Sequence, residues 1–357
     1  MRLAFLFHKD PLHAPASIDL IRLRALAAGL RARGVEVAVV APVRASAWLP
    51  GPVPVLPLAV LGEKGRFDVL KACYHFSLEL LGDYDGPLVC RLVRVVDEQL
   101  PERDASVRAR LLACQELARE RAAGIVLNNR LNAERWRVRY GRRQRLCLLP
   151  AGCPATLPPP GPSPYAPGLP PLLFLGSVAS ARTALLLNEA AERLSGRAAV
   201  HLVGRNKTAL YGASCGLSPR IAQHGERPEP EVWDYVRHAR LGLALAAGPE
   251  PFDNELSKII AYVRAGLPVL GEERLANAGL FLRRDFGALF RYGDAAHLRT
   301  RAEELLARDF EPRRREIMVR AAATHSWERR AIVLERFLRV LTGRVGRFAE
   351  SEMPAGI

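Results

Sequence analysis

The chain has 357 residues, of which 49% are apolar and 25% charged, which suits two soluble globular domains. No apolar run approaches the ~18 residues that a membrane-spanning helix needs. The first ten residues, MRLAFLFHKD, fit a buried strand better than a secretory signal, so a cytoplasmic location is expected. The six cysteines form no C-x-x-C pair and have no histidine at zinc-ligand spacing, so neither a disulfide framework nor structural zinc is predicted.

The net charge of +15 is concentrated in the first part of the chain. Residues 1–150 contain 24 Lys and Arg against 15 Asp and Glu, and the densest run, 130–145, has seven Arg and one Glu. Three interpretations are open: a solvated surface, attraction to anionic lipid head groups, and nucleic-acid binding. Because no helix-turn-helix, RNP or zinc-finger pattern is present, nucleic acid is not expected. An anionic membrane surface on the cytoplasmic side stays a candidate partner.

The first 150 residues alternate between strand and helix patterns. Residues 2–7 form an apolar run, residues 17–33 carry a helical apolar stripe that Gly34 ends, and residues 35–40 form the next apolar run. Such a series predicts a parallel βαβ unit. The pattern continues with predicted strands over 87–96, 124–128 and 145–149 and predicted helices over 103–123 and 132–140. We therefore expect a doubly wound α/β domain over residues 1–153.

Residues 154–171 contain nine of the 27 prolines. Proline disfavours both the helix interior and the central strand, so this segment is predicted to be a stiff, extended domain linker.

A second α/β series follows the linker. Strands are predicted over 172–175, 198–203, 221–224, 241–246 and 268–270, and helices over 183–194, 229–239, 257–265, 294–307, 311–323 and 327–341. These elements predict a second domain over 172–325, a helix over 326–345 and a flexible tail over 346–357. The expected fold class is thus α/β, with two Rossmann-like doubly wound domains facing a cleft.

Ligand-binding and catalytic residues are expected just after the strands, because ligands of doubly wound sheets bind outside the carboxyl ends of the strands. Three loops of the second domain combine glycine, which lets a phosphate approach the backbone, with cations that bind phosphate. They begin at Gly176, Gly204 and Gly248. The candidate residues in these loops are Ser177, Arg182, Arg205, Asp253, Asn254, Glu255, Ser257 and Lys258.

The order of these segments resembles the donor domain of the GT-B glycosyltransferases, above all glycosyltransferase family 4. The resemblance rests on LFLGSVASAR (173–182), QHGERPEPEVW (223–233), NELSKIIAYVRAGLPVL (254–270) and HSWER (325–329). It implies a GT-B fold with an acceptor-binding first domain, a donor-binding second domain and a C-terminal helix that crosses back to the first domain.

The resemblance also implies an activity: transfer of a sugar from a nucleoside diphosphate sugar, of the UDP or GDP type, to a glycan, lipid-linked or small-molecule acceptor. Cell-surface polysaccharide or glycoconjugate synthesis is the expected setting, with no cofactor and no metal. Lys258 and Arg182 are expected to stabilise the leaving diphosphate, and Asp97 to act as base if the reaction inverts, with Glu98 and Asp10 as alternates. The expected donor-binding residues are Gly176, Ser177, Arg205, His224, Gly225, Asp253, Asn254, Glu255 and Ser257, and the acceptor-side residues are His8 and Asp10.

Two positions depart from the family pattern. Asp253 and Ala261 stand where the family usually has two glutamates, and residues 7–10 replace its Gly-Gly loop. The D-x-D sequence at 83–85 is flanked by glycines and is interpreted as a turn, in which Asp is a favoured residue, rather than as a metal site. Two alternatives stay open: a nucleotide-sugar epimerase on the same fold, and a catalytically weak sugar-nucleotide-binding protein.

Overall fold

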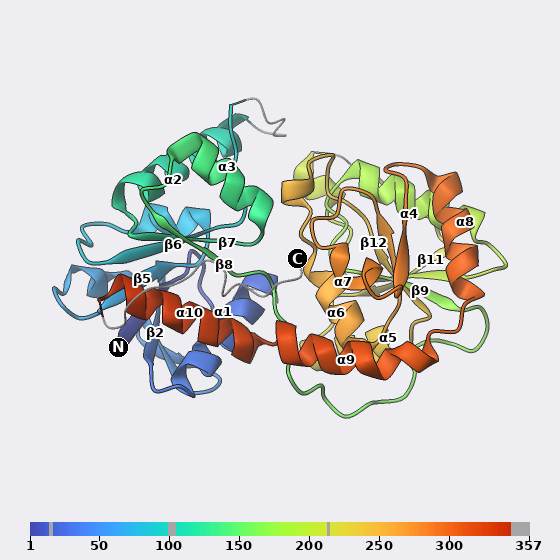
Figure 1. Cartoon of the computed structure of the whole chain (residues 1–357), viewed down its shortest axis with the longest axis horizontal. Helices are drawn as coiled ribbons and strands as arrows, with labels where there is room; N and C mark the ends of the chain where they lie inside the picture. The colour runs from blue at the N-terminus through green and yellow to red at the C-terminus, as the bar shows by residue number, and fades with distance from the viewer. Residues whose placement is uncertain (14–16, 99–104, 213–214, 344–357) are drawn as a thin grey trace. The chain divides into compact units, whose positions relative to one another are not determined.

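A computed structural model describes residues 1–13, 17–98, 105–212 and 215–343. The chain forms two compact units. Unit 1 comprises Met1–Gly152 together with the C-terminal segment from Ser326, and unit 2 comprises Cys153–His325. The chain therefore leaves unit 1 once and returns to it, and its last helix belongs to unit 1 (Figure 1). The predicted tail over 346–357 lies outside the described residues.

Unit 1 is built on an eight-stranded sheet with the order β3-β4-β2-β1-β5-β6-β7-β8, parallel except for the β3–β4 pair. Its strands are β1 (Arg2–Leu6), β2 (Glu36–Ala41), β3 (Ala47–Leu49), β4 (Val53–Pro57), β5 (Val69–Ala72), β6 (Leu88–Leu92), β7 (Gly124–Leu127) and β8 (Arg145–Leu148). Its α-helices are α1 (Ile18–Arg31), α2 (Ala105–Arg121), α3 (Arg130–Tyr140) and α10 (Trp327–Leu341), and its short 3-10 helices are η1 (Leu58–Gly62) and η2 (His75–Leu80).

Helices cover both faces of the unit 1 sheet, with α2 and α3 on one face and α1 and α10 on the other (Figure 1). α10 packs along α1, and the place where a Gly29 side chain would stand is filled by Ala331, 2.7 Å from a Cβ built there. Side-chain caps begin the main helices: Ser17 Oγ accepts from Leu20 N at α1, and Asn129 accepts from Asn132 N at α3. Both faces of the sheet are thus buried, as the apolar strands require.

Unit 2 is built on a six-stranded parallel sheet with the order β11-β10-β9-β12-β13-β14. Its strands are β9 (Pro171–Leu175), β10 (Ala199–Val203), β11 (Ile221–Gly225), β12 (Leu241–Ala244), β13 (Val269–Glu272) and β14 (Gly287–Phe290). Its α-helices are α4 (Ala181–Arg193), α5 (Glu229–His238), α6 (Ser257–Ala265), α7 (Gly279–Leu282), α8 (Ala295–Leu306) and α9 (Glu311–His325), and its 3-10 helices are η3 (Thr208–Tyr211) and η4 (Pro251–Asp253).

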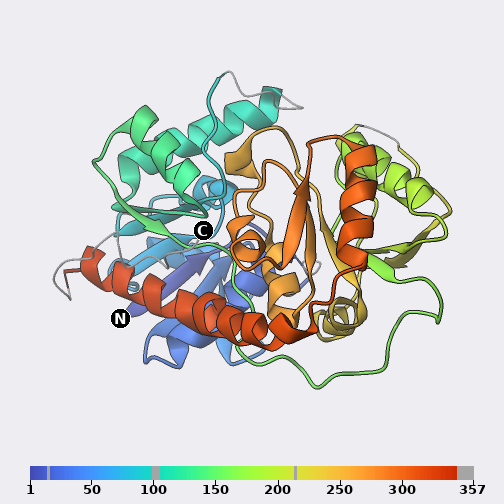
Figure 2. The same ribbon diagram turned by 45° about the vertical axis from the view of Figure 1, so that its right-hand side comes forward.

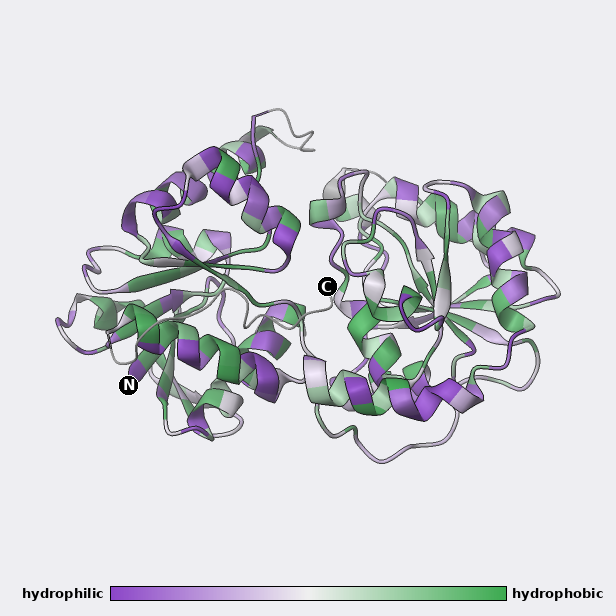
Figure 3. Ribbon diagram, viewed as in Figure 1, coloured by the Kyte–Doolittle hydropathy of each residue, from purple (hydrophilic) through white to green (hydrophobic). Residues whose placement is uncertain are grey.

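The helices of unit 2 also lie on both faces of its sheet. Helices α4 and α8 contact each other on one face, while α6 contacts α5 and α9 on the other (Figure 2). Figure 3 shows hydrophobic colour along the strands of both units and hydrophilic colour on the outward sides of the helices. Each unit is therefore a doubly wound α/β sandwich, as predicted.

The proline-rich segment 154–170, predicted as part of a stiff, extended domain linker over 154–171, packs onto unit 2. The Arg264 guanidinium donates to Pro154 O at 2.9 Å and to Ala155 O at 2.6 Å, and the Tyr165 hydroxyl donates to Tyr235 O at 2.7 Å. Arg264 of α6 thus satisfies carbonyl groups that a proline-rich chain cannot pair in a ladder, and Tyr165 of the segment binds the backbone of α5 in return. The segment forms part of unit 2.

Four strands were not predicted from the sequence: β3, β4, β5 and β14. Prolines interrupt the β4 sequence VPVLP, and β3 is only three residues long. In β5, Lys71 breaks the apolar run, although its side chain is 1% exposed. β14 begins at Gly287, which sequence patterns place in turns. Pairing with neighbouring strands, rather than local preference, makes these segments strands.

Candidate functional site

The order of strands in unit 2 reverses direction between β9 and β12. The chain proceeds from β9 to β10 and β11 on one side, and then places β12 on the other side of β9. β9 and β12 pair only at Leu172 and Leu241 and at Leu173 and Gly242, so they separate toward their carboxyl ends. Ligands of doubly wound sheets bind at such a reversal, outside the carboxyl ends of the strands. The β9/β12 switch point is therefore the candidate site of unit 2.

The hydroxyl of Tyr262, from α6, lies where β9 and β12 separate. It accepts a hydrogen bond from Leu175 N at 3.0 Å and lies within donating distance of Leu173 O, at 3.0 Å, and Leu243 O, at 3.2 Å. The ring fits because residue 242 is glycine: a Cβ there would stand 2.5 Å from the Tyr262 ring. Tyr262 thus satisfies the backbone groups that the separated strands leave without a ladder partner.

Lys258, one helical turn before Tyr262, holds an ammonium group at this switch point. Its Nζ lies 3.5 Å from the ring centroid of Phe174, the fourth residue of β9. Within the described residues, no carboxylate pairs with Lys258. Burial lowers the pKa of Lys258 to about 7, since a charge without a partner is costly in an apolar environment. A bound anion would supply the missing negative charge.

Two further features favour an anion next to Lys258. Helix α6 begins at Ser257 with no side-chain cap on its free N–H groups, and these groups carry the positive end of the helix dipole. Gly176, directly after β9, has φ +109°, and a Cβ built on it would stand 3.8 Å from Lys258 Nζ. Gly204 approaches so closely that its Cβ would stand 2.2 Å from Gly176 O. The structure therefore brings Gly176, Ser257 and Lys258 together.

Arg182, the second predicted phosphate ligand, is already paired. Its guanidinium forms an ion pair with the fully buried Glu272, donates to Ala246 O at 3.0 Å, and lies 3.9 Å over the Tyr292 ring. Glu272 also accepts hydrogen bonds from Ala246 N at 2.8 Å and Gly293 N at 2.7 Å. This Glu272 cluster joins α4 to the loops after β12 and β14. Arg182 is thus placed to organise these loops.

The other predicted residues after β10 and β11 lie in two different environments. Arg205, with a 64% exposed side chain, pairs with Glu226 at 2.9 Å. His224 faces the proline-rich segment and α5: its Nε2 lies 2.9 Å from Nδ1 of His201, and its ring packs against Tyr235. Burial lowers the pKa of His224. Gly225 has φ +73°, and its carbonyl accepts from Gly204 N at 2.8 Å.

The loop between β12 and α6 contains three more predicted residues. Asn254 is fully buried, accepts from Ala247 N at 2.7 Å and donates to the carbonyls of Gly248 and Glu250, so it shapes the loop. Asp253 ends η4 and is half-buried, as is Glu255. Ser177, in the loop after β9, is exposed.

The predicted residues of unit 1 lie on two loops. His8, after β1, stacks on Tyr74, which follows β5, with ring centroids 5.0 Å apart, and burial lowers its pKa. Asp10 accepts from Leu12 N at 2.9 Å and contacts His13, and the hydrogen bond from His13 lowers the pKa of Asp10. β1 and β5 are adjacent strands at the point where the strand order of this sheet reverses, so His8 lies at the unit 1 switch point.

Asp97 lies elsewhere in unit 1, after β6. Its Oδ2 is 2.6 Å from Nη2 of Arg135, whose Nε donates to Val95 O at 3.1 Å. The structure therefore does not bring Asp97 to the same strand junction as His8 and Asp10.

Sequence patterns missed Asp19 and Arg91 of unit 1. Arg91, 3% exposed in β6, donates to Asp19 Oδ1 at 2.9 Å and to Cys73 O at 3.1 Å. Asp19 lies in the first turn of α1, and its negative charge raises the pKa of His8 against the lowering by burial. The available signal was the acidic residue two positions after the Ser17 cap, which also fits ordinary helix capping.

Among the described residues, no group of three or more His, Cys, Asp or Glu side chains is arranged to hold a metal ion. In the same part of the chain, no helix is both long enough and apolar enough to cross a bilayer.

Known protein structures share this architecture. No protein-family model matches the sequence, and no curated protein matches it. Solved structures do match: sucrose-phosphate synthase from Thermosynechococcus elongatus has a TM-score of 0.70 at 16% identity, covering 96% of this chain and 100% of that one. HepE from Anabaena in complex with UDP-glucose has a TM-score of 0.69 at 15% identity, with 97% and 100% covered. WaaG, a glycosyltransferase involved in lipopolysaccharide biosynthesis, has a TM-score of 0.59 at 14% identity, with 96% and 100% covered.

The fold is that of the GT-B glycosyltransferases, and the predicted resemblance to this fold is confirmed. At these identities the similarity establishes the fold, and the function is argued from the site.

Proposed function

We propose that the protein is a glycosyltransferase that takes its sugar from a nucleoside diphosphate sugar. The observation that carries this proposal is the unpaired Lys258 at the β9/β12 switch point, next to the uncapped start of α6 and the open backbone of Gly176. The similar structure of HepE contains UDP-glucose, which supports a donor of this class. A diphosphate would supply the negative charge that Lys258 lacks.

The site supports departure of a nucleoside diphosphate. Sugar transfer passes through an oxocarbenium-like state while negative charge grows on the leaving phosphate. Lys258 and the N–H groups at the start of α6 would stabilise that charge, and the surrounding apolar side chains strengthen the interaction. Arg182 would support the site by holding the loops after β12 and β14 rather than by binding the phosphate, because Glu272 already neutralises its charge.

We propose that unit 1 binds the acceptor, a glycan, a lipid-linked molecule or a small molecule. If the reaction inverts the anomeric carbon, a base must remove the acceptor proton. Asp97 is the base proposed from the sequence, and its use would require that the Arg135 contact opens. His8 has a pKa lowered by burial and lies at the unit 1 switch point, so it is the alternative base.

The setting is proposed to be cell-surface polysaccharide or glycoconjugate synthesis by an enzyme located in the cytoplasm and associated with the inner face of the membrane. A lipid-linked acceptor would place the reaction at a bilayer surface. Metal-independent catalysis remains part of the proposal.

Thermal unfolding with and without UDP, GDP, UDP-glucose and GDP-mannose tests the donor proposal. A ligand at a hundredfold excess over its dissociation constant stabilises the folded state by about 2.7 kcal/mol, or roughly 5 °C or more in a domain of this size. We expect such a shift from at least one diphosphate, and we expect Lys258→Ala to lose it. Lys64→Ala, a change at an exposed lysine of unit 1, is the matched control and should keep the shift.

The absence of any shift with all four nucleotides, or an equal shift in Lys258→Ala, would contradict the donor proposal. Chromatography of the bound sugar nucleotide separates the remaining activities. An isomerised sugar nucleotide formed without acceptor would indicate an epimerase, and binding without transfer or isomerisation would indicate a binding protein.

A further inference from the structure

Strand β11, at one edge of the unit 2 sheet, carries an extra residue. Gln223 and Gly225 pair with successive residues of β10, and the register shifts between them, so His224 is the extra residue of a β-bulge. A bulge turns a side chain out of the ordinary alternation of a strand, and bulges are frequent beside functional sites. Because β11 is an edge strand with β10 as its neighbour, the position of its last residues depends on what holds the bulge.

A second histidine holds the bulged residue. Nε2 of His224 lies 2.9 Å from Nδ1 of His201 in β10, and the two rings are nearly parallel, at 15°. One ring must donate and the other must accept, so a proton on both rings would break the bond. Tyr165 of the proline-rich segment packs edge-on against His201, with ring centroids 4.6 Å apart, and Tyr235 of α5 packs against His224 at 4.7 Å. Four segments of unit 2 thus meet at the histidine pair.

The surroundings of the pair favour its neutral form. Burial lowers the pKa of His201 to about 4, and the neighbouring His224 lowers it further. Burial also lowers the pKa of His224, as does the positive charge of Arg227 in the loop after β11. At neutral pH the two rings therefore share one hydrogen bond without a net charge.

The other titratable groups around the pair do not oppose this neutral form. Burial raises the pKa of the Tyr165 hydroxyl, which stays uncharged. Glu226, next to the bulge in sequence, binds two cations of the loop after β10, at 2.9 and 3.3 Å. Asp234 of α5 accepts from Gly161 N at 2.9 Å. Both carboxylates thus have other partners.

The carbonyl of Gly225, directly after the bulge, joins β11 to the candidate site. It accepts from Gly204 N at 2.8 Å. Gly204 stands so close to Gly176 that a Cβ on it would lie 2.2 Å from Gly176 O, and Gly176 N donates to Val203 O at 2.8 Å. Gly176 is also the residue whose open backbone lies next to Lys258. A shift of the bulge would therefore displace the backbone beside Lys258, because these contacts leave no free space between the glycines.

We propose that His201 and His224 are positioning residues of the donor site, because their hydrogen bond fixes the β-bulge that sets three glycines beside Lys258. The inference rests on the proposed function and deepens it, since it assigns to this pair the backbone geometry in which a diphosphate is bound. His224, expected from the sequence to bind the donor, acts here through the backbone that follows it.

Titration calorimetry with UDP and with GDP at neutral pH tests the proposal on the full chain. His201→Leu and His224→Leu remove the hydrogen bond, and each should weaken nucleotide binding about tenfold. The double variant His201→Asn, His224→Gln places amide groups where the bonded ring nitrogens stand, so its affinity should stay within about threefold of the wild-type value. His238→Leu is the matched control: His238 is an exposed histidine of α5 that contacts Gly161 O of the proline-rich segment at 3.0 Å, and its loss should leave affinity unchanged.

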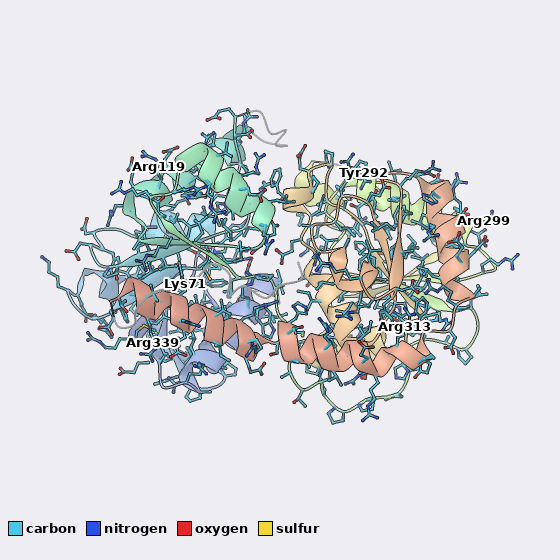
Figure 4. All side chains as sticks on the ribbon, in the orientation of Figure 1. Lys71, Arg119, Tyr292, Arg299, Arg313 and Arg339 are labelled. Carbon is cyan, nitrogen blue, oxygen red and sulfur yellow. The ribbon has the colours of Figure 1, made fainter. Side chains whose placement is uncertain are left out.

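Amide hydrogen exchange measured by NMR reports on the same backbone without any ligand. The N–H of Gly204 should exchange about tenfold faster in either Leu variant and at nearly the wild-type rate in the double variant. Arg299→Leu is a second control, at an arginine of α8 that pairs with Glu303 at 3.0 Å (Figure 4). It should change neither nucleotide affinity nor Gly204 exchange.

The pH profile gives a readout that a purely structural role would not move. As the pH falls from about 6.5 to about 4, an opened pair takes up protons that the closed pair does not, so opening becomes more favourable and nucleotide affinity should fall. The double variant has no titrating ring at either position. It should lose only the affinity that protonation of the nucleotide's own phosphate removes.

Unchanged affinity and unchanged Gly204 exchange in the Leu variants would overturn the proposal. Equal pH profiles for the wild-type protein and the double variant, or an equal loss of affinity in His238→Leu, would also overturn it. If the wild-type protein bound neither nucleotide, the donor proposal would be contradicted, and Gly204 exchange would still decide whether the histidine pair fixes the glycine backbone.

Discussion

Lys258 is the residue on which the donor site depends. Its ammonium group lies over the Phe174 ring and lacks a carboxylate partner among the described residues, and burial lowers its pKa to about 7. A charge in an apolar environment is costly unless a partner is supplied. A ligand phosphate would be such a partner, so its binding would favour the charged form of Lys258.

Proton uptake on nucleotide binding follows from this environment. Above pH 7 Lys258 is mostly neutral in the free protein, while a bound diphosphate favours the charged form and raises its pKa. Binding should therefore take up a proton between about pH 7 and 9, and affinity should fall by up to about tenfold per pH unit in that range. Calorimetry in buffers of different ionisation enthalpy measures the proton count.

Lys258→Arg is the control for this prediction, because arginine stays charged throughout the range. Any nucleotide binding that it retains should show neither proton uptake nor this fall in affinity. Equal proton uptake in Lys258→Arg would assign the titration to another group.

At the scale of elements, the Glu272 cluster joins segments that follow different strands. Glu272, at the end of β13, receives Arg182 from α4 and backbone N–H groups from the loops after β12 and β14. The loop after β12 adjoins the candidate site. Because Glu272 is fully buried, these donors supply the hydrogen bonds and the counter-charge that its carboxylate would otherwise obtain from water.

Glu272→Gln should therefore destabilise unit 2 and loosen the loops. The amide leaves the partly buried Arg182 without a counter-charge and replaces an acceptor with a donor, and breaking a buried pair costs about 3–5 kcal/mol. Urea unfolding followed by circular dichroism measures the loss. Glu273→Gln, at the adjacent exposed position, should change the unfolding free energy by less than about 0.5 kcal/mol. Similar effects of the two changes would show that the cluster does not organise the loops.

The elements also show where sequence patterns suffice. Helix α6 was predicted with its observed bounds, because its apolar spacing and the following Gly266 leave one interpretation. Strand β5 was missed, since Lys71 interrupts its apolar run, and only the fold buries that lysine against the Phe5 ring. Local sequence does not encode such long-range partners.

The same limit applies to the site. Gly176 and Lys258 could be proposed from their positions after strands, and the structure brings them together. The pairing of Arg182 with Glu272, 90 residues away, had no local signal, nor did the Tyr262 hydroxyl between β9 and β12. Both contacts depend on the strand order of the sheet.

At the scale of the molecule, two sheets of similar design carry different residues at their switch points. In unit 2, the β9/β12 switch point holds an unpaired ammonium group and an uncapped helix start. In unit 1, the β1/β5 switch point holds His8 stacked on Tyr74, near the ion pair of Asp19 and Arg91. The first arrangement suits a phosphate. It agrees with the proposed donor site in unit 2, and the proposed acceptor site is assigned to unit 1.

A crystal structure of the protein soaked with UDP tests the central claim most directly. The account predicts the diphosphate at the β9/β12 switch point, with a phosphate oxygen about 3 Å from Lys258 Nζ and another accepting from the first N–H groups of α6. Diphosphate density elsewhere in the molecule, with Lys258 Nζ out of contact, would contradict it.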